Sequence, residues 1–470
     1  MTTEEALPEG WTKTTLGEIS IVKMGQSPNG KSYNKEKEGY LLIGGASDLG
    51  DIYPSPKQYT NEATKLSKTN DIIICIRATI GRLNLSDKVY CLGRGVAGIE
   101  VNANVEAKFI WYSLMNSKAY LLKNSTGTTF QQVSSPTLKK LPIVYPTSKE
   151  TQQAIVNKIE SLFAEIDAGI CSLKTAAQQI QQYRQSLLKN AFNGELTKEW
   201  RSKHAETLPS ENELLAQIQT TREQHHAQQL ADWQTAVSQW EQNGKEGKKP
   251  SKPKAPTQAV KFEENFADLP KGWLESSLGD TTDVFVGSTP SRKNNEYWDG
   301  DISWVSSGEV NFSNIFETKE KITNLGLSNS STNIHPIGTV MLAMIGEGKT
   351  RGQAGILKIE ACHNQNTAAI RVNKKYLLSE YLYYFFMFNY EQTRRIGSGN
   401  NQKALNKTII ENMSFPICSL TEQTQIVAIL ETKLTACDQL ADELAKQLKQ
   451  AELLKQAVLK AAFSGSLLDK

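Results

Sequence analysis

The stretch LLKNAFNGELT at residues 187–197 returns in altered form as VLKAAFSGSLL at residues 458–468. Both stretches have the composition of a helix end, because a glycine follows the last apolar residues and can adopt the left-handed conformation of a C-terminal cap. A second matching pair lies upstream, where LPEGWTKTTLGEI at 7–19 corresponds to LPKGWLESSLGDT at 269–281. The chain therefore contains an internal repeat.

The repeat extends through both halves of the chain in a single order. The spacing between matching stretches grows from 262 residues at the first pair to 271 residues in the middle of each half, as small insertions would produce. The further matches are YCLGRGVAGIEVN (90–102) with ACHNQNTAAIRVN (361–373), FIWYSLM (109–115) with YLYYFFM (381–387), and ETQQAIV (150–156) with EQTQIV (422–427). The chain consequently consists of two related units in tandem.

Each half is predicted to contain a mixed globular segment followed by one very long helix. Apolar runs typical of strands occur at Ile72–Ile76 and Val340–Met344. About 44 residues then separate a helix start from the glycine of a helix end, a length of about 65 Å at 1.5 Å per residue. A helix of this length is too long to cover one small domain.

Both long helices carry signals for their start and their end. Capping boxes are predicted at Thr147-x-x-Glu150 and Ser419-x-x-Glu422, in which hydroxyl and carboxylate groups satisfy free backbone donors. The glycines that follow the helices are Gly194 and Gly465. These signals predict helices beginning near residues 150 and 419.

The long helices have the heptad pattern of a coiled coil. The first is predicted to place two sets on its seam, namely Ile159, Ile166, Leu173, Ile180, Leu187 and, three residues later, Leu162, Ala176, Tyr183. The second is predicted to use Leu430, Cys437, Leu444, Ala451, Val458 together with Leu440 and Leu454. The expected fold class is α+β: two similar mixed α/β domains separated by two long antiparallel coiled-coil helices, with a pseudo-twofold internal repeat.

Residues 197–262 have no counterpart in the other half. The Gln-rich stretch at 211–242 predicts a helix, and NGKEGKKPSKPKAP at 243–256 predicts a basic, proline-containing linker. The adjacent histidines His225 and His226 face different sides of such a helix, which favours a solvated surface over a metal site. The lysines indicate a solvated tether, with phosphate contact as the alternative.

Composition excludes several classes of protein. A hydrophobic content of 39% and a charged content of 22% are ordinary for a soluble protein, and no apolar run approaches the length of a membrane span. The six cysteines form no CxxC pair, and the N-terminal residues do not look like a secretion signal. We therefore expect a cytoplasmic protein with no bound metal and no membrane association. A net charge of +3 permits a polyanionic partner only if the positive charges are clustered.

The segment AMIGEGKT, Ala343–Thr350, fits a permissive phosphate-loop pattern after a strand-like run. A phosphate loop leads into a helix N-terminus, whereas the sequence that follows here is RGQAGILKIEACH. We therefore expect no catalysis by the chain itself. A nucleotide hydrolase with a coiled-coil arm remains an alternative, as does a repeat scaffold that binds protein.

Polar loop residues of both globular segments are candidates for DNA contact. Arg and Lys can pair with guanine, Asn and Gln with adenine, and hydroxyl groups with phosphate. The structural alternative is that these loops use the same residue types for turns. The candidates are Arg77, Thr79, Arg82, Arg94, Thr128, Thr129, Gln131 and Gln132 in the first segment, and Arg292, Lys349, Arg351, Gln353, Asn364, Gln365, Asn400, Asn401, Gln402 and Lys403 in the second.

The ordered duplication resembles the specificity (S) subunit of type I restriction-modification systems over almost the whole chain. The motifs most typical of that family are LPEGW (7–11), AFNGELTKEW (191–200) and EQTQIV (422–427). The resemblance implies a first target-recognition domain at 1–149, a first spacer helix at 150–196, a helical insert and basic linker at 197–262, a second target-recognition domain at 263–418 and a second spacer helix at 419–470. The insert departs from the family pattern, and its role stays open.

The resemblance also implies the function and the partners. Each globular segment would read one half of a bipartite, asymmetric site on double-stranded DNA. Two methyltransferase (M) subunits would bind S-adenosylmethionine, and restriction (R) subunits would add ATP-dependent and Mg-dependent translocation and cleavage, so that this chain itself binds no cofactor. At the ends of the coil, the residues predicted to pack, either locally or against the methyltransferase, are Phe192, Gly194, Phe463 and Gly465.

Overall fold

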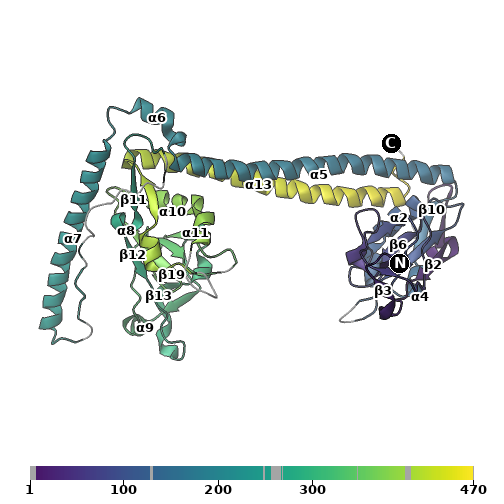
Figure 1. Cartoon of the computed structure of the whole chain (residues 1–470), viewed down its shortest axis with the longest axis horizontal. Coiled ribbons are helices and arrows are strands. Elements are labelled where there is room, and N and C mark those ends of the chain that lie inside the picture. The colour runs from purple at the N-terminus through teal and green to yellow at the C-terminus, as the bar shows by residue number, and fades with distance from the viewer. Residues whose placement is uncertain are drawn as a thin grey trace. The chain divides into compact units, whose positions relative to one another are not determined.

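The computed structural model describes residues 7–127, 131–246, 249–253, 255, 266, 268–346, 348–396 and 404–468. The chain divides into two compact units. Unit 1 comprises Met1–Ala177 and Asp442–Lys470, and unit 2 comprises Gln178–Ala441. Each unit therefore combines one globular domain with a segment of each long helix (Figure 1).

The globular domain of unit 1 contains two four-stranded sheets, with strand orders β2-β9-β6-β7 and β3-β5-β4-β8, and a two-stranded pair, β1-β10. Its elements are β1 (Trp11–Thr15), α1 (Leu16–Ile19), β2 (Ser20–Met24), β3 (Tyr33–Asn34), β4 (Tyr40–Ile43), β5 (Tyr59–Thr60), β6 (Ile72–Cys75), β7 (Leu83–Leu85), β8 (Cys91–Leu92), β9 (Val96–Val101), α2 (Ala107–Asn116), α3 (Lys118–Lys123), α4 (Ser135–Lys139) and β10 (Pro142–Pro146).

The globular domain of unit 2 has sheets of order β12-β19-β16-β17-β14 and β15-β13-β18, and a two-stranded pair, β11-β20. Its elements are β11 (Leu274–Ser277), α8 (Leu278–Thr281), β12 (Thr282–Val286), β13 (Trp298–Val305), β14 (Ser313–Ile315), β15 (Glu320–Ile322), α9 (Asn324–Ser328), β16 (Val340–Ala343), β17 (Ala354–Leu357), β18 (Cys362–His363), β19 (Thr367–Val372), α10 (Ser379–Phe388), α11 (Tyr390–Arg395), α12 (Lys407–Glu411) and β20 (Ser414–Ile417).

The two domains share one design. In both, a mainly antiparallel sheet carries a short parallel pair beside it, β4 with β8 in unit 1 and β13 with β18 in unit 2, and β14 adds one parallel edge strand to the sheet of unit 2. One apolar helix covers each sheet: Phe109 and Ile110 of α2 belong to the core that contains Ile72, whereas Tyr381 and Phe385 of α10 belong to the core of unit 2. The internal repeat and the α+β fold class are therefore confirmed.

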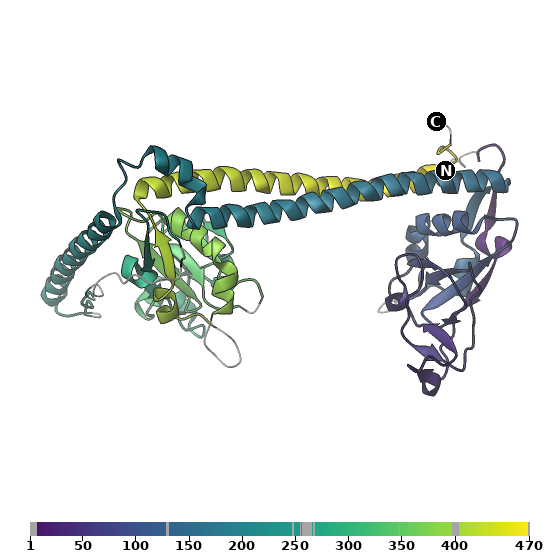
Figure 2. The ribbon, with the colours of Figure 1, turned by 45° about the horizontal axis from the view of Figure 1, so that its top comes forward.

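The long helices are α5 (Lys149–Phe192) and α13 (Leu420–Phe463), each of 44 residues. In unit 1, Lys455 of α13 forms an ion pair with Asp167 of α5 at 2.5 Å. In unit 2, Arg184 of α5 forms an ion pair with Asp438 of α13. Within unit 2, Thr197, just beyond α5, bonds Glu422, and within unit 1, Ile155 of α5 shares a core with Ala462 of α13, so numbers rise along one helix as they fall along the other. The helix segments within each unit are therefore antiparallel, as predicted (Figures 1 and 2).

The first of the two predicted sets of seam residues in α5 is correct at both ends of the set, where Ile159 and Leu187 are buried. The second set is wrong by one residue. Its heptad spacing passes through Tyr183, which is exposed, and through position 169, whereas the buried residue is the next one, Ile170. The same shift occurs in α13, where Leu440 and Leu454 are exposed. Positions three and four residues apart lie on the same helix face, so sequence alone did not distinguish them.

The predicted capping boxes are only partly correct. The first cap is Ser148 and not Thr147, because Ser148 Oγ accepts from the Thr151 N–H at 3.2 Å. Ser419 caps α13 as predicted, accepting from the Glu422 N–H at 3.3 Å. The Glu422 carboxylate, however, does not complete the box: it accepts from Arg201 Nη1 (2.5 Å), Thr197 Oγ1 (2.7 Å) and Trp273 Nε1 (3.0 Å).

The glycines at the helix ends are left-handed caps, as expected: φ is +78° at Gly194 and +85° at Gly465. Both positions also require glycine because of close packing. A Cβ atom on Gly194 would lie 2.1 Å from Pro270 Cγ, and one on Gly465 would lie 2.3 Å from Pro8 Cγ. The AFxGxL motif that ends each half thus packs against the LPxGW motif that begins the other half, once within each unit.

The insert belongs to unit 2. It contains α6 (Lys198–Lys203) and α7 (Glu211–Gln242), and α7 buries Leu214 and Ile218 in the core of unit 2. The linker then returns along α7, where Trp233 Nε1 donates to the Pro250 carbonyl at 3.0 Å and the Lys249 ammonium lies 5.9 Å from the Trp240 ring centre. The basic linker is therefore packed on its own helix over these residues.

Candidate nucleic-acid interface

In unit 1, the loops that follow β2 and β6 meet the loop that precedes β9 at one edge of the four-stranded sheet. They meet there because both strands run antiparallel to β9. Gln26 N donates to the Leu92 carbonyl at 2.8 Å, and Ile76 N donates to the Gly95 carbonyl at 3.0 Å. We define the first edge as residues 25–27, 76–82, 93–95 and 131–132.

The first edge brings most of the predicted residues together. Arg77, Thr79, Arg94, Gln131 and Gln132 are all exposed. A β-bridge joins Arg77 to Gln132, so a segment more than fifty residues downstream lies beside the end of β6. The first edge therefore presents guanidinium, hydroxyl and amide groups on one short stretch of sheet.

A buried cysteine supports the turn that carries Arg77. Burial raises the pKa of the Cys75 thiol, which therefore keeps its proton and donates to the Arg77 carbonyl at 3.2 Å. Ala78, next in the turn, has a φ of +56°. A positive φ is unusual for a residue with a side chain, so the surrounding contacts hold the turn in this shape.

Arg82 differs from the other predicted residues of the first edge. Its guanidinium donates to the carbonyl oxygens of Ala46 (3.1 Å), Leu49 (2.7 Å) and Gly50 (3.2 Å). The side chain is exposed, yet its donors hold the 46–50 loop. Sequence analysis placed Arg82 among DNA-contacting residues, and the structure gives it this supporting contact.

Unit 2 forms an equivalent edge with different side chains. Ser288 N donates to the His363 carbonyl at 3.1 Å, and Met344 N donates to the Asn366 carbonyl at 2.9 Å, which joins the loops after β12 and β16 to the loop before β19. We define the second edge as residues 287–289, 344–346, 348–353 and 364–366. Exposed Gln365 accepts a hydrogen bond from Thr289 Oγ1 at 2.5 Å.

The remaining predicted residues of the second edge differ in accessibility. Lys349 is exposed and Gln353 is half-buried. Arg351 is buried, with Nη2 donating to the Arg394 carbonyl at 2.6 Å, and Asn364 is buried, with Oδ1 accepting from Asn366 N at 3.0 Å. Arg351 and Asn364 therefore shape the loops in the free chain, a contribution that the sequence did not reveal.

Arg292 lies three residues beyond Thr289 in a separate cluster. Both of its terminal nitrogens bond the Glu320 carboxylate, and its guanidinium lies 3.8 Å from the Trp298 ring centre. The hydrogen bond from Arg292 lowers the pKa of Glu320. A cavity of about 240 Å³ adjoins this cluster and is also lined by Asn295 and Asp299.

Six predicted residues lie outside the described residues: Thr128, Thr129, Asn400, Asn401, Gln402 and Lys403.

The phosphate-loop alternative is not supported by the local fold. After β16 the chain passes through turns at 348–352 and enters β17, so the described part of AMIGEGKT leads into a strand. The Lys349 carbonyl accepts a hydrogen bond from the Tyr390 hydroxyl at 2.5 Å, which fixes the loop to α11. A helix N-terminus, the feature that gives a phosphate loop its anion affinity, does not follow Lys349.

The predicted packing residues at the coil ends contact their own units. Phe192 is 1% exposed, and its ring lies within 5.2–5.6 Å of the rings of Tyr381, Phe385 and Phe388. Phe463 is only half-buried, and its ring centre lies 5.2 Å from that of Phe109. Packing at the coil ends is thus intramolecular in the described residues.

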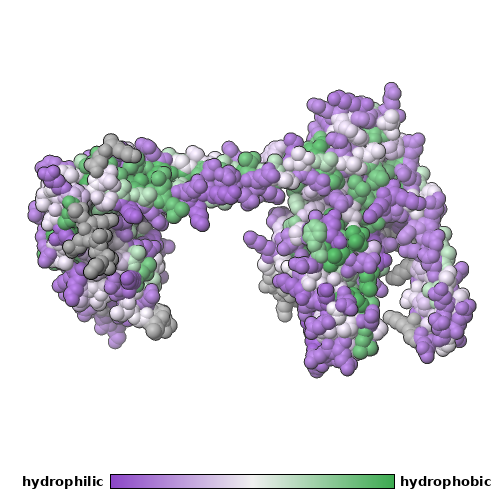
Figure 3. Space-filling view, turned by 180° about the vertical axis from the view of Figure 1, so that it is seen from behind, coloured by the Kyte–Doolittle hydropathy of each residue, from purple (hydrophilic) through white to green (hydrophobic). Residues whose placement is uncertain are grey.

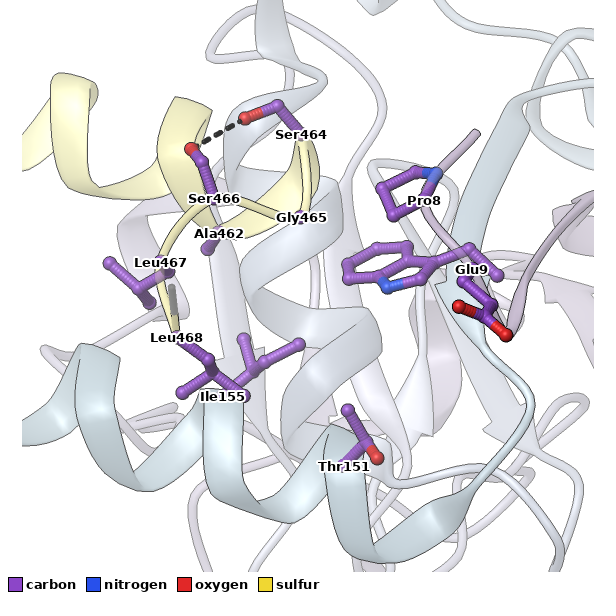
Figure 4. Close-up of a pocket in the computed structure, with 11 residues that line it drawn as sticks. Pro8, Glu9, Thr151, Ile155, Ala462, Ser464, Gly465, Ser466, Leu467 and Leu468 are labelled. Atoms are coloured by element: carbon purple, nitrogen blue, oxygen red, sulfur yellow. Dashed lines mark hydrogen bonds between the residues drawn. The ribbon is translucent and has the colours of Figure 1, made fainter. Parts of the chain in front are cut away.

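The two coil ends differ in what covers them. In unit 2, Thr197 and Arg201 cover the end of the coil through Glu422. In unit 1 the capping serine is Ser148, so Thr151, three residues later, takes the position that Glu422 has after Ser419. A cavity of about 330 Å³ is present there (Figure 4). The cavity is lined by Pro8, Glu9, Trp11, Thr151, Ile155, Ala462, Ser464, Gly465, Ser466, Leu467 and Leu468.

Sequence analysis missed Gln26, Ser27 and Thr289 at the two edges. A signal for them was available, because they lie one or two residues after Gly25 and Gly287, which are 262 residues apart like the first matching pair of the repeat. A Cβ atom on Gly25 would lie 2.1 Å from the Gly93 carbonyl oxygen, and one on Gly287 would lie 2.0 Å from that of His363. The repeated glycines thus mark where two loops approach closely at each edge.

Two further features of the described residues concern the requirements of a metal site and of a membrane-spanning helix. In the residues that the structure describes, no group of His, Cys, Asp and Glu side chains is arranged to hold a metal ion. Among the same residues, none of the helices combines the length and the apolar character that crossing a membrane requires.

The sequences of both units match one family of proteins. The model of the type I restriction modification DNA specificity domain matches residues 8–172 and 270–450, which include both edges and most of the two long helices. The chain belongs to this family.

Relatives in the family are specificity subunits of type I restriction enzymes. The putative MjaX specificity subunit of Methanocaldococcus jannaschii is 33% identical over 193 residues, which cover 40% of this chain and 44% of that protein. The HindI specificity subunit of Haemophilus influenzae is 25% identical over 303 residues, covering 62% of this chain and 64% of that protein. The chain spans about half the length of most of the curated relatives it matches.

Solved structures share the fold at low sequence identity. The HsdS subunit from Thermoanaerobacter tengcongensis aligns with a TM-score of 0.56 at 17% identity, covering 99% of both chains. A chain from a structure that addresses complex assembly and conformational transition of the type I R-M system aligns with a TM-score of 0.68 at 17% identity, covering 98% of this chain and 100% of that one. These alignments support the fold of both units.

Proposed function

We propose that the chain recognises a bipartite, asymmetric site on double-stranded DNA and directs partner methyltransferase and restriction subunits to it. One observation carries this proposal: two domains of one design present equivalent edges that bear different side chains. Related scaffolds with different reading groups are expected to bind half-sites of different sequence. Membership of the DNA specificity domain family supports the same conclusion.

The first edge has groups suited to guanine and phosphate. Arg77 and Arg94 are exposed, and a guanidinium can donate two hydrogen bonds to guanine O6 and N7. The hydroxyl of Thr79 is suited to phosphate. The second edge has the exposed amide of Gln365 beside the Thr289 hydroxyl, and Gln can pair with adenine N6 and N7. The two half-sites should consequently differ in base composition.

The partners are proposed to bind along the long helices. Hydrophobic residues are interspersed with hydrophilic ones on the helix surface that Figure 3 shows. The exposed large apolar side chains of these helices are Tyr183, Leu440, Leu453 and Leu454. We assign S-adenosylmethionine to two methyltransferase subunits, and ATP and Mg²⁺ to restriction subunits, and we assign no catalysis to this chain.

Exchange of the second domain tests the division of recognition. Residues 263–418 are replaced by the corresponding segment of another family member, and both whole chains select from a pool of duplexes randomised throughout. The selected second half-site should change completely while the first stays the same. A change in both halves contradicts the modular division, and no enrichment of any sequence favours a protein-binding scaffold.

A matched pair of insertions tests the helices as the spacer. Seven residues added to both α5 and α13 preserve the heptad seam and lengthen each helix by about 10 Å. The selected half-sites should move apart by about 3 base pairs, since DNA rises about 3.4 Å per base pair. The same seven residues added within α7 are the control and should leave the spacing unchanged. An unchanged spacing in both variants would exclude the helices as the spacer.

A further inference from the structure

The second domain contains a buried chain of hydrogen bonds that begins at Arg371 and ends at the second edge. Arg371 Nε donates to His335 Nδ1 at 3.0 Å, and the two histidines meet through their Nε2 atoms at 3.2 Å. His363 Nδ1 lies 2.8 Å from Thr367 Oγ1, which in turn lies 3.1 Å from the Asn364 carbonyl oxygen. His335, His363 and Thr367 have no exposed surface.

The direction of each hydrogen bond follows from Arg371, because a guanidinium can only donate. His335 must therefore accept at Nδ1 and carry its proton on Nε2. That proton is donated to His363 Nε2, so His363 carries its proton on Nδ1 and donates to Thr367. The Thr367 hydroxyl then donates to the Asn364 carbonyl. All of these hydrogen bonds can run in one direction, from Arg371 to Asn364, only when both histidines are neutral.

The environment of the pair keeps both rings neutral. Burial lowers the pKa of His335 to about 3 and that of His363 to about 4, and the nearby Arg371 acts in the same direction on both. The charged groups facing the pair are Arg371 of β19 and, beyond it, Asp283 of β12, which interacts with Arg371. The hydrogen-bonded arrangement is therefore the one populated at neutral pH.

The last groups of this row of hydrogen bonds fix the loop that carries Gln365. The His363 carbonyl accepts from Ser288 N (3.1 Å) and from Thr332 Oγ1 (2.8 Å), while Asn364 N donates to the Val305 carbonyl at 3.0 Å. Thr367, at the other end of the loop, accepts from His363. The exposed Gln365 amide thus lies between two residues that the buried network holds.

The first domain has none of these groups at the equivalent positions. By the strand pairing and the repeat spacing, Ser67 corresponds to His335, Leu92 to His363, Val96 to Thr367 and Glu100 to Arg371. Unit 1 contains no histidine, since all five lie between residues 204 and 363. The network is therefore particular to the second domain and is not required by the shared scaffold.

We propose that His335, His363 and Thr367 are positioning residues that set the geometry of Gln365 and Thr289, and hence the base preference of the second half-site. The proposal rests on the proposed DNA-recognition function. The three residues do not contact DNA, because they are buried. They act through the loop 364–366, which they hold at the second edge.

Thr367→Val is the sharpest test, because it removes the hydroxyl with little change of shape and introduces the residue that the first domain has at this position. The whole chain and each variant select from a duplex pool randomised throughout, and base preference is measured separately in the two half-sites. The half-site of the second domain is identified by the exchange of residues 263–418. Preference there should fall about tenfold, with the first half-site unchanged.

Two further variants separate positioning from general loss of structure. Thr367→Ser keeps the hydroxyl and should retain most of the preference. Thr281→Val removes another buried hydroxyl of the same domain, which donates to the Ser277 carbonyl at 3.0 Å far from the second edge, and should leave both half-sites unchanged. Equal preference in wild type and folded Thr367→Val, or equal loss in both half-sites, overturns the proposal. Absence of selection by the wild-type chain instead rejects the proposed function itself.

Discussion

The two domains share their main sheet strands and covering helix, but their edges are stabilised differently. In unit 1 the turn after β6 rests on Cys75 and presents Arg77. In unit 2 the loop before β19 rests on the His335–His363 pair and presents Gln365. The shared scaffold therefore supports different loops in the two domains, the turn after β6 in one and the loop before β19 in the other, each on its own buried contacts.

The largest expected difference concerns the two coil ends. Phe192→Ala should lower the free energy of unfolding of unit 2 by about 3–5 kcal/mol, because it removes a buried ring that contacts three others. Phe463→Ala should cost unit 1 only about 2 kcal/mol, since that ring is half-buried. Hydrogen exchange resolved by unit measures both. Equal losses would mean that the ends are energetically equivalent despite their different burial.

Acid should destabilise unit 2 selectively. His335 and His363 have folded pKa values of about 3 and about 4, below the ordinary value of 6.5. Below pH 6.5 the unfolded chain binds protons that the folded unit excludes, so stability is complete above pH 6.5 and falls as pH falls. With two such groups, the free energy of unfolding of unit 2 should fall by about 2 kcal/mol between pH 6.5 and 5.5.

Unit 1 is the internal control for this pH dependence, because it has no histidine. Hydrogen exchange at the two pH values, corrected for the intrinsic exchange rate, should show increased opening of β18 and β19 and a smaller change in β8 and β9. His335→Gln should remove part of the dependence. A parallel response of both units would contradict the assignment to the buried pair.

Two arginines of the first edge should have separable effects. Arg77→Ala should lower affinity for the selected duplex about tenfold, since it removes an exposed guanidinium, a contact worth about 1–3 kcal/mol. Arg82→Ala should mainly increase hydrogen exchange in the 46–50 loop, whose carbonyl groups it holds. Fluorescence anisotropy measures the affinity of Arg77→Ala for two duplexes, the selected one and one in which only the second half-site is scrambled. If Arg82→Ala lowered the affinity for DNA without increasing exchange in the loop, and Arg77→Ala left the affinity unchanged, the roles assigned to the two arginines would be reversed.

The smallest expected effect is that of Lys349→Ala on nucleotide hydrolysis. The loop leads into β17, so the purified wild-type chain should show no ATPase activity and the variant should show none either. Sustained phosphate release by the wild-type chain alone, abolished by the substitution, would restore the phosphate-loop interpretation.

Sequence patterns predicted the architecture because the repeat, the heptads and the terminal glycines are local or periodic signals. They failed where the deciding contact lies far along the chain. Glu422 looked like half of a capping box, yet its partners are Thr197, Arg201 and Trp273. The sequence likewise did not reveal that Arg82 and Arg351, predicted as DNA contacts, also hold backbone carbonyl groups of distant loops, because both tasks use the same residue types.

The reciprocal contacts of Gly194 with Pro270 and of Gly465 with Pro8 have a genetic consequence. Each domain is bounded by motifs that also bound the other, so homologous sequence flanks both domains. A crossover between two genes within either motif would join a new domain to an existing helix while retaining both sides of each glycine–proline contact. New combinations of the two domains can thus arise by recombination, without any change to the glycine–proline packing at the junctions.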